Sequence, residues 1–149
     1  MRGLVAIAIL LLGGCVTGPG SVGSLPLGDA AAFEVEVQPV LEAGCANPSC
    51  HGNADRPLEV YARFQYRLDP DRLYLDEPIT ADELTHNRRS AAGFLVGFAA
   101  AARSPLLTKP LAHDAGGAHH AGGVVFGDAQ EPGYRALKAW ADGALEEAD

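Results

Sequence analysis

Several residue types and patterns are scarce or missing in this chain of 149 residues. It has one methionine, Met1, and its 11 lysines and arginines are outnumbered by 19 acidic residues, for a formal net charge of −8. The absence of a basic stripe argues against electrostatic binding of nucleic acid. Neither a nucleophile elbow nor a phosphate loop occurs, so the common catalytic motifs give no support to an enzyme. A chain that loses Met1 also has no thioether to offer a metal ion.

The amino terminus has the form of an export signal. Arg2 precedes an apolar run, residues 4–12, that is shorter than the about 20 residues needed to cross a bilayer. We therefore predict a signal peptide over residues 1–14. Its end, Leu12-Gly13-Gly14-Cys15, resembles the lipobox of bacterial lipoproteins, which implies a lipid on Cys15. An ordinary secretory signal with a spare cysteine is the alternative.

Export has consequences for charge and location. Removing residues 1–14 takes away one positive charge, Arg2, so the formal net charge falls from −8 to −9. We expect a protein of the cell envelope, on the periplasmic or outer-membrane side and held to the membrane by the lipid on Cys15. Disulfides persist there, and haem is attached to exported chains there.

The rest of the chain divides into a tether and one domain. Residues 15–29 are rich in glycine, serine and proline, which is typical of a flexible tether. Residues 30–149 are enough for one hydrophobic core. The fold class that we predict is mainly α, a small helical domain with long irregular loops.

Hydrophobic spacing and capping signals place the helices. Phe33, Val37 and Leu41 recur at helical spacing over residues 30–44, with Pro39 either kinking the helix or restarting it. Thr80 to Glu83 has the form of a capping box, which predicts a helix to about residue 93. Ser104-Pro105 predicts one or two further turns before Pro110. An amphipathic helix closes the chain over residues 131–146, with Trp140 packing against the first helix.

The stretch between residues 51 and 78 is less regular. Residues 58–61 could form a short strand. Four aromatic residues interleave with arginines here, and we expect them to pack in the core: Tyr61, Phe64, Tyr66 and Tyr74.

Two cysteines and a histidine fall within seven residues of each other. Once Cys15 is set aside, Cys45 and Cys50 form the single remaining pair, and His51 follows directly. In c-type cytochromes two cysteine sulfurs bond covalently to haem, and the histidine after the second cysteine ligates the iron. Four residues separate the cysteines here, a wider spacing that some c-type cytochromes use. The alternative is a Cys45–Cys50 disulfide with His51 incidental.

A glycine-rich segment carries further histidines. Residues 111–126 contain His113, His119 and His120 among glycines and alanines, so a loop backbone there can approach something flat. A second iron ligand would come from this loop. A mobile surface loop, or a small metal-scavenging patch formed by the histidine pair, is the alternative. We set His86 aside as a surface residue of its helix.

Taken in order, these segments resemble a family of exported mono-haem cytochrome c domains. In that family a helix F-x-x-x-V-x-P-x-L precedes the cysteines, and a segment S-x-L-L-x-K-P, a loop H-x-G-G and a helix D-x-x-Y-x-x-L-x-x-W follow. The matching residues here are Phe33, Val37, Pro39, Leu41, Cys45, Cys50, His51, Ser104, Leu106, Leu107, Lys109, Pro110, His120, Gly122, Gly123, Tyr134, Leu137 and Trp140. The match covers roughly residues 33–141.

This resemblance implies a cytochrome c-like domain around one haem c. It implies that Cys45 and Cys50 form the haem thioethers, that His51 is the proximal iron ligand, and that His120 is the distal ligand, with His119 the alternative. Two histidines and no methionine would give a low-spin iron of comparatively low potential.

We therefore expect an electron carrier, not an enzyme, that exchanges electrons with a redox partner protein. If the loop histidine leaves the iron, the open position would admit a small gas or peroxide, and the protein would be a sensor or weak peroxidase. A different class of function is a haem-free lipoprotein with a Cys45–Cys50 disulfide that binds an envelope partner. A third is a zinc or copper site formed by Cys45, Cys50, His51 and a loop histidine.

Overall fold

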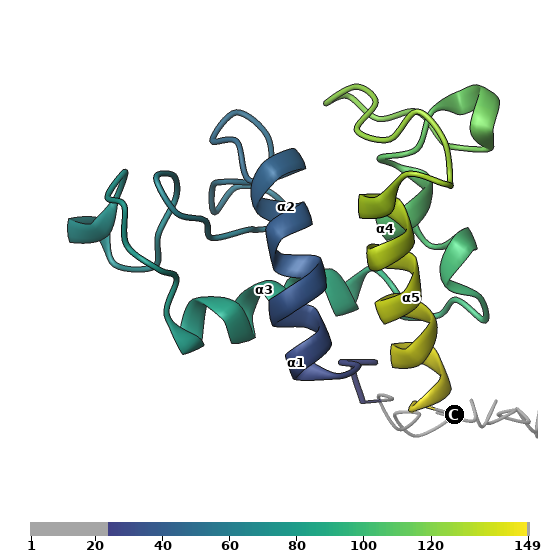
Figure 1. Ribbon diagram of the computed structural model, residues 1–149, viewed down its shortest axis with the longest axis horizontal. Coiled ribbons are helices and arrows are strands. Elements are labelled where there is room, and N and C mark those ends of the chain that lie inside the picture. Colours follow the sequence, from purple (N-terminus) through teal and green to yellow (C-terminus); the bar gives the residue numbers. More distant parts are fainter. Residues whose placement is uncertain (1–23, 149) are drawn as a thin grey trace, which may run out of the picture.

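The computed structural model describes residues 24–148, and over this range the protein is mainly α (Figure 1), as predicted. Cys15, the signal peptide over residues 1–14 and most of the predicted tether lie outside the described residues. Within residues 24–148, no helix is both long and apolar enough to cross a membrane. The elements in chain order are α1 (Ala30–Ala32), η1 (Phe33–Val37), α2 (Gln38–Gly44), η2 (Pro70–Arg72), α3 (Ala81–Gly93), η3 (Ala101–Arg103), α4 (Pro105–Thr108), η4 (His113–Ala115) and α5 (Pro132–Glu146).

The elements α1, η1 and α2 form one helical rod, as the sequence predicts for residues 30–44. Asp29 caps its start by accepting a hydrogen bond from the Ala32 backbone N–H. The middle of the rod is a π-helical turn, because Pro39 has no N–H to donate to the turn before it. The Gln38 N–H donates instead to the Phe33 carbonyl, five residues earlier. The rod therefore restarts with Pro39 in the first turn of α2, one of the two predicted forms.

The core lies between this rod and α5. Phe33 and Trp140 meet edge to face with ring centroids 5.0 Å apart, which confirms the predicted contact between the last helix and the first. Tyr134, Leu137 and Trp140 lie on the buried face of α5. Burying such large apolar side chains is worth about 1.5–3 kcal/mol each. This packing fixes α5 beside the rod (Figure 1).

The packed part of the chain begins before Ala30, where the predicted domain boundary lies. Pro26 is buried, and Leu27 packs against the core. At Gly28, which has a φ of +60°, an added Cβ would lie 2.9 Å from both Ala144 and Trp140. This close approach needs a glycine. The end of the segment predicted as a tether is therefore part of the domain surface.

The helix α3 begins and ends where its sequence signals place it. The Thr80 hydroxyl accepts from the Glu83 backbone N–H, and the Glu83 carboxylate accepts from the Thr80 N–H, which completes the predicted capping box. The short helix α4 likewise follows Ser104 and stops before Pro110. Both predictions are confirmed, because the signals that set these ends are local.

The strand predicted over residues 58–61 is absent from the described chain, because side chains of α3 take the place of a partner strand. Asn87 accepts from the Tyr61 N–H and donates to the Tyr61 carbonyl, both at 2.8 Å. Ser90 accepts from the Glu59 N–H at 2.9 Å. The backbone of the segment is therefore hydrogen-bonded without belonging to a sheet.

A buried ion pair holds the loop between residues 62 and 80. The side chains of Arg67 and Glu83 are 0% and 1% exposed, and they pair at 2.9 Å. Arg67 also donates to the carbonyls of Glu77 and Pro78. Glu83 further accepts from the Leu68 N–H. Burial alone would raise the pKa of Glu83, but these bonds lower that pKa well below its ordinary value.

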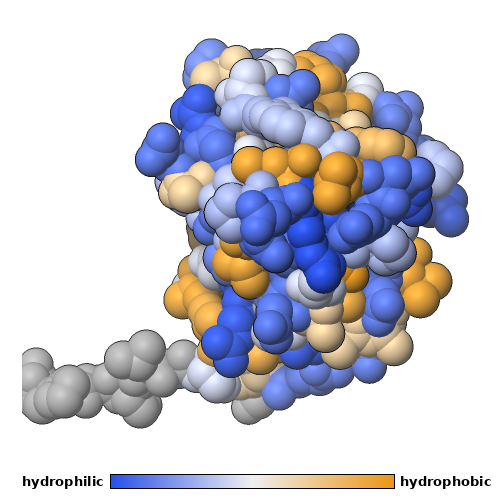
Figure 2. Space-filling model, turned by 90° about the vertical axis from the view of Figure 1, so that its left-hand side faces the viewer, coloured by the Kyte–Doolittle hydropathy of each residue, from blue (hydrophilic) through white to orange (hydrophobic). Residues whose placement is uncertain are grey.

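The prediction that all four aromatics of this stretch lie in the core is wrong for two of them. Phe64 and Tyr74 are 54% and 64% exposed, and both have left-handed backbones, with φ of 59° and 62°. The interior of their loop is occupied by Arg67 instead. Figure 2 faces this flank, where apolar side chains lie in small groups among charged ones. Tyr61 is buried, as predicted, and stacks on Tyr66 at 5.1 Å.

Candidate functional site

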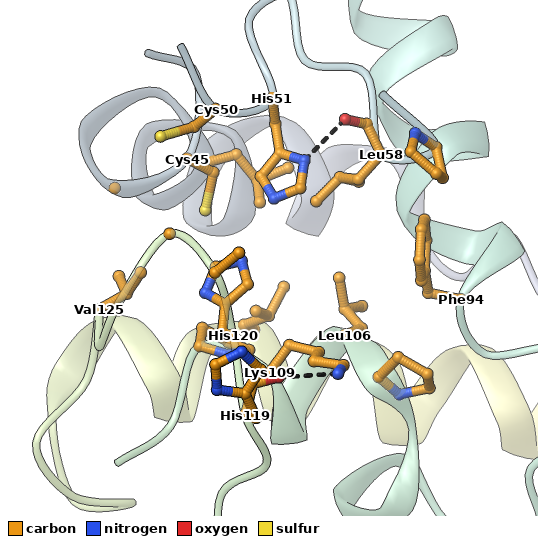
Figure 3. Close-up of a pocket in the computed structure, with 18 residues that line it drawn as sticks. Cys45, Cys50, His51, Leu58, Phe94, Leu106, Lys109, His119, His120 and Val125 are labelled. Atoms are coloured by element: carbon orange, nitrogen blue, oxygen red, sulfur yellow. Dashed lines mark hydrogen bonds between the residues drawn. The ribbon is translucent and has the colours of Figure 1, made fainter. Parts of the chain in front are cut away.

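One pocket gathers the residues that the motifs single out. Its volume is about 360 Å³, and Cys45, Cys50, His51, His119 and His120 all contribute to its walls (Figure 3). The remaining wall is mostly apolar and includes Leu41, Leu58, Phe94, Leu106, Val125 and Leu137. His113, the third histidine of the glycine-rich segment, is not among the lining residues. The two candidate sequence segments therefore meet across a single apolar space.

The first wall is a compact loop that starts where α2 ends. The wide spacing between the cysteines is absorbed by a turn in which the Cys50 N–H donates to the Asn47 carbonyl at 2.7 Å. The Asn47 side chain accepts from the Ser49 N–H. The His51 N–H then donates to the Cys45 carbonyl at 3.1 Å. These bonds bring His51 back beside Cys45 although five residues separate them.

Gly52 allows this loop to close. An added Cβ there would lie 1.9 Å from the Ala46 carbonyl oxygen, so no other residue fits without moving the backbone. The Gly52 N–H also donates to the Asn47 carbonyl at 3.0 Å. The glycine that directly follows the Cys-His pair is therefore a structural requirement of the first wall.

The His51 ring is oriented by a backbone carbonyl from another segment. Its Nδ1 lies 2.9 Å from the Leu58 oxygen, so Nδ1 carries the proton and Nε2 keeps a free lone pair. Burial lowers the pKa of His51 below its ordinary value, against the opposing effect of this hydrogen bond. The ring is thus neutral at pH 7, which is the form that binds metal ions.

Both cysteines of the first wall are free thiols. Burial, followed by the charge of Cys50, raises the pKa of the Cys45 thiol to about 11. Cys45 is therefore a neutral thiol at neutral pH as long as no metal ion is bound to it. Within residues 24–148, no group of three or more histidine, cysteine, aspartate or glutamate side chains is arranged to hold a metal ion.

The second wall is the loop between α4 and α5. The Nδ1 atom of His120 lies 2.9 Å from the Gly123 carbonyl oxygen. The Nε2 atom of His120 is therefore left free, as is the Nε2 atom of His51. Gly122 packs directly on this ring, since an added Cβ would lie 3.1 Å from its Cε1 atom. His119 is more exposed, and its carbonyl accepts a bond from the Lys109 side chain at 2.7 Å.

The two imidazole rings face each other across the pocket. Their centroids lie 5.9 Å apart and their planes differ by 8°. Figure 3 shows a nitrogen of each ring directed into the gap between the walls. One metal ion bonded to both rings would place their centres about 6 Å apart, given metal–nitrogen bonds of about 2 Å. The observed 5.9 Å is close to this value, so the two rings are spaced to bind one ion between them.

The structure brings together Cys45, Cys50, His51 and His120, as the motifs predict, and it also adds residues that the sequence reasoning missed. The Leu58 carbonyl, which orients His51, is a backbone group and leaves no signal in the sequence. Phe94 closes the far side of the pocket from the end of α3. Lys109 belonged to a recognised motif, but the motif does not reveal its bond to the neighbouring loop.

No family model, no curated protein and no solved structure matches this chain.

Proposed function

We propose that this protein is an exported, membrane-tethered c-type cytochrome that carries electrons through one covalently bound haem. The observation that carries the proposal is the pair of near-parallel imidazoles, His51 and His120, held 5.9 Å apart in an apolar pocket with two free thiols in its walls. The cytochrome c-like fold, the lipid on Cys15 and a location in the cell envelope are parts of the same proposal. A separate redox protein would be its partner.

Each residue of the pocket has a role in this proposal. Cys45 and Cys50 would form thioether bonds to the haem, and His51 and His120 would ligate the iron from opposite sides. When bound, the haem supplies a one-electron iron couple. Leu58 holds His51 as the Nε2-ligating tautomer, and a hydrogen bond of this kind raises ligand basicity.

The apolar walls also have a functional consequence. Side chains such as Leu41, Leu106 and Phe94 give the pocket a mostly apolar lining. The surroundings of a haem in such a low-dielectric site would rearrange little when the iron gains or loses one electron. The burial of the haem would also help to set its reduction potential. With two histidine ligands and no thioether ligand, we expect a lower potential than in cytochromes with a histidine and a methionine. An iron with six ligands transfers electrons without binding a substrate.

The proposal is tested by the absorption spectrum of the full chain, produced in an exporting host with haem attachment machinery and extracted in detergent. We expect haem that stays with the protein after denaturation, with sharp low-spin bands in the reduced form. Cys45→Ser with Cys50→Ser should lose the covalent haem. A folded, colourless protein would show that the proposal is wrong and would leave the haem-free lipoprotein as the better interpretation.

The two loop histidines provide a matched pair of variants. We expect His120→Ala to keep covalent haem but to become high-spin, because one axial ligand is gone. His119→Ala should keep the wild-type spectrum, since His119 does not face His51. The reverse result would make His119 the distal ligand.

A further inference from the structure

Two adjacent histidines line the pocket, yet only His120 faces His51. Both offer the same imidazole, so chemistry does not choose between them. The chain has no regular secondary structure over residues 117–120, so no helix or sheet fixes the peptide between the two histidines. A rotation of that peptide would change which of the two rings faces His51. The contacts that hold this backbone decide which histidine faces the iron position.

Those contacts come from the end of α4. The Ala118 N–H donates to the Thr108 carbonyl at 2.8 Å. Lys109, the C-cap residue of α4, donates from Nζ to the His119 carbonyl at 2.7 Å. Beyond the turn, the Val125 N–H donates to the Pro110 carbonyl at 2.9 Å. The loop is therefore fixed on both sides of the histidine pair by three consecutive residues, 108–110.

Lys109 differs from the other two anchors because it acts through its side chain. Among the hydrogen bonds described for residues 117–123, this is the only one donated by a side chain from outside the loop. Charged donors form the stronger class of hydrogen bond. The bond also falls on His119 itself, at the peptide group that would have to rotate. Substituting Lys109 removes it without changing any backbone group.

We propose that Lys109 is a positioning residue that holds His119 away from the iron and so makes His120 the distal ligand. This inference rests on the proposed function. With the ammonium bound to the His119 carbonyl, the peptide between the two histidines cannot turn. Without it, the loop can place the His119 ring in the pocket. Gly122, which packs on the His120 ring, favours the same arrangement from the other side.

The test is a gain of ligation in a protein that lacks His120. His120→Ala, purified with its haem, should be high-spin, because Lys109 keeps His119 out. Adding Lys109→Met should shift most of the haem to low-spin, since His119 is then free to bind. Adding His119→Ala as a third change should return it to high-spin. Absorption and electron paramagnetic resonance spectra measure each step.

Two matched controls distinguish the positioning role of Lys109 from a general effect of losing a positive charge or of changing the side chain at position 109. Lys138 is partly exposed, pairs with Asp142 on α5 and does not line the pocket. His120→Ala with Lys138→Met should therefore stay high-spin. His120→Ala with Lys109→Arg should also stay high-spin, because the guanidinium keeps a donor at that position.

The outcomes that overturn the proposal are distinct from failure of the proposed function. A wild-type protein without haem would refute the cytochrome itself. With haem present, two results refute the role of Lys109. One is a low-spin His120→Ala protein. The other is a His120→Ala, Lys109→Met protein that stays high-spin on its own but binds added imidazole.

Discussion

The two irregular segments that form the pocket are held in different ways. Residues 45–80 are fixed largely by buried side chains, among them the Arg67–Glu83 pair and Asn87, which reach across tens of residues. Residues 109–131 are fixed mainly by backbone hydrogen bonds within the segment and by glycines. The exposed Lys109 adds one side-chain hydrogen bond, to the His119 carbonyl. The Cys-His loop therefore continues into a segment that is anchored in the core, whereas the loop that carries His120 is anchored mainly at the surface.

The largest expected loss of stability comes from removing the buried ion pair that holds the first segment. Glu83→Gln leaves the guanidinium of Arg67 buried without a counter-charge, and removing one partner of such a pair costs about 3–5 kcal/mol. We expect a loss of that size in the free energy of unfolding, measured by urea denaturation. Asp76→Asn is the control, because the Arg63–Asp76 pair is about half exposed and is worth about 1 kcal/mol at most. Equal losses would remove the distinction between buried and exposed pairs.

A pair of glycine substitutions compares the two segments directly. Gly52→Ala places a methyl group against the Ala46 carbonyl and should destabilise the protein by about 2–3 kcal/mol. Gly123→Ala meets open space but keeps a φ of +84°, so it should cost only about 1 kcal/mol. Thermal unfolding of the two variants measures the difference. If Gly123→Ala were the more damaging, the distal loop would be the more rigid wall.

The smallest expected effect is a pH dependence of the free energy of unfolding, which arises from Glu83 in the first segment. The pKa of Glu83 is lowered in the folded protein, so its contribution to stability is complete above its ordinary value near 4.5 and is lost as pH falls toward the lowered value. Between pH 5 and pH 3 we expect the wild type to lose part of the energy that Glu83→Gln removes outright. The variant, which has no carboxylate there, should show a flatter profile over the same range. Parallel profiles would mean that other carboxylates dominate acid unfolding.

The helices were predictable because their signals are local. Thr80 and Glu83 lie three residues apart, and the spacing of Phe33, Val37 and Leu41 depends on one helix face. The path of residues 45–80 was not predictable, because it depends on distant partners: Asn87 bonds to Gln38 across 49 positions and to Tyr61 across 26. An arginine that takes the interior of a loop, with two aromatics outside it, contradicts ordinary expectations of burial.

In the candidate site, too, the local features were predictable and the features that depend on distant contacts were not. Cys45, Cys50 and His51 are neighbours in sequence, and their motif was enough to predict that they act together. His120 was predicted to join them through the family resemblance, and the structure brings it to face His51. The bond from Lys109 to the His119 carbonyl, which we propose selects His120 over His119, depends on how α4 and the loop pack together. Sequence spacing does not contain that information.

The direction of the helical rod has a consequence for how the protein meets its partners. The rod begins beside the first described residues and ends at the Cys-His loop, at the opposite end of the molecule (Figure 1). At about 1.5 Å per residue, its 15 residues, 30–44, separate the two ends by roughly 22 Å. If Cys15 carries the proposed lipid, the full length of the rod lies between the lipidated segment and the pocket along the chain. The proposed redox partner would then meet the protein at the end of the rod that carries the pocket, roughly 22 Å from where the rod begins.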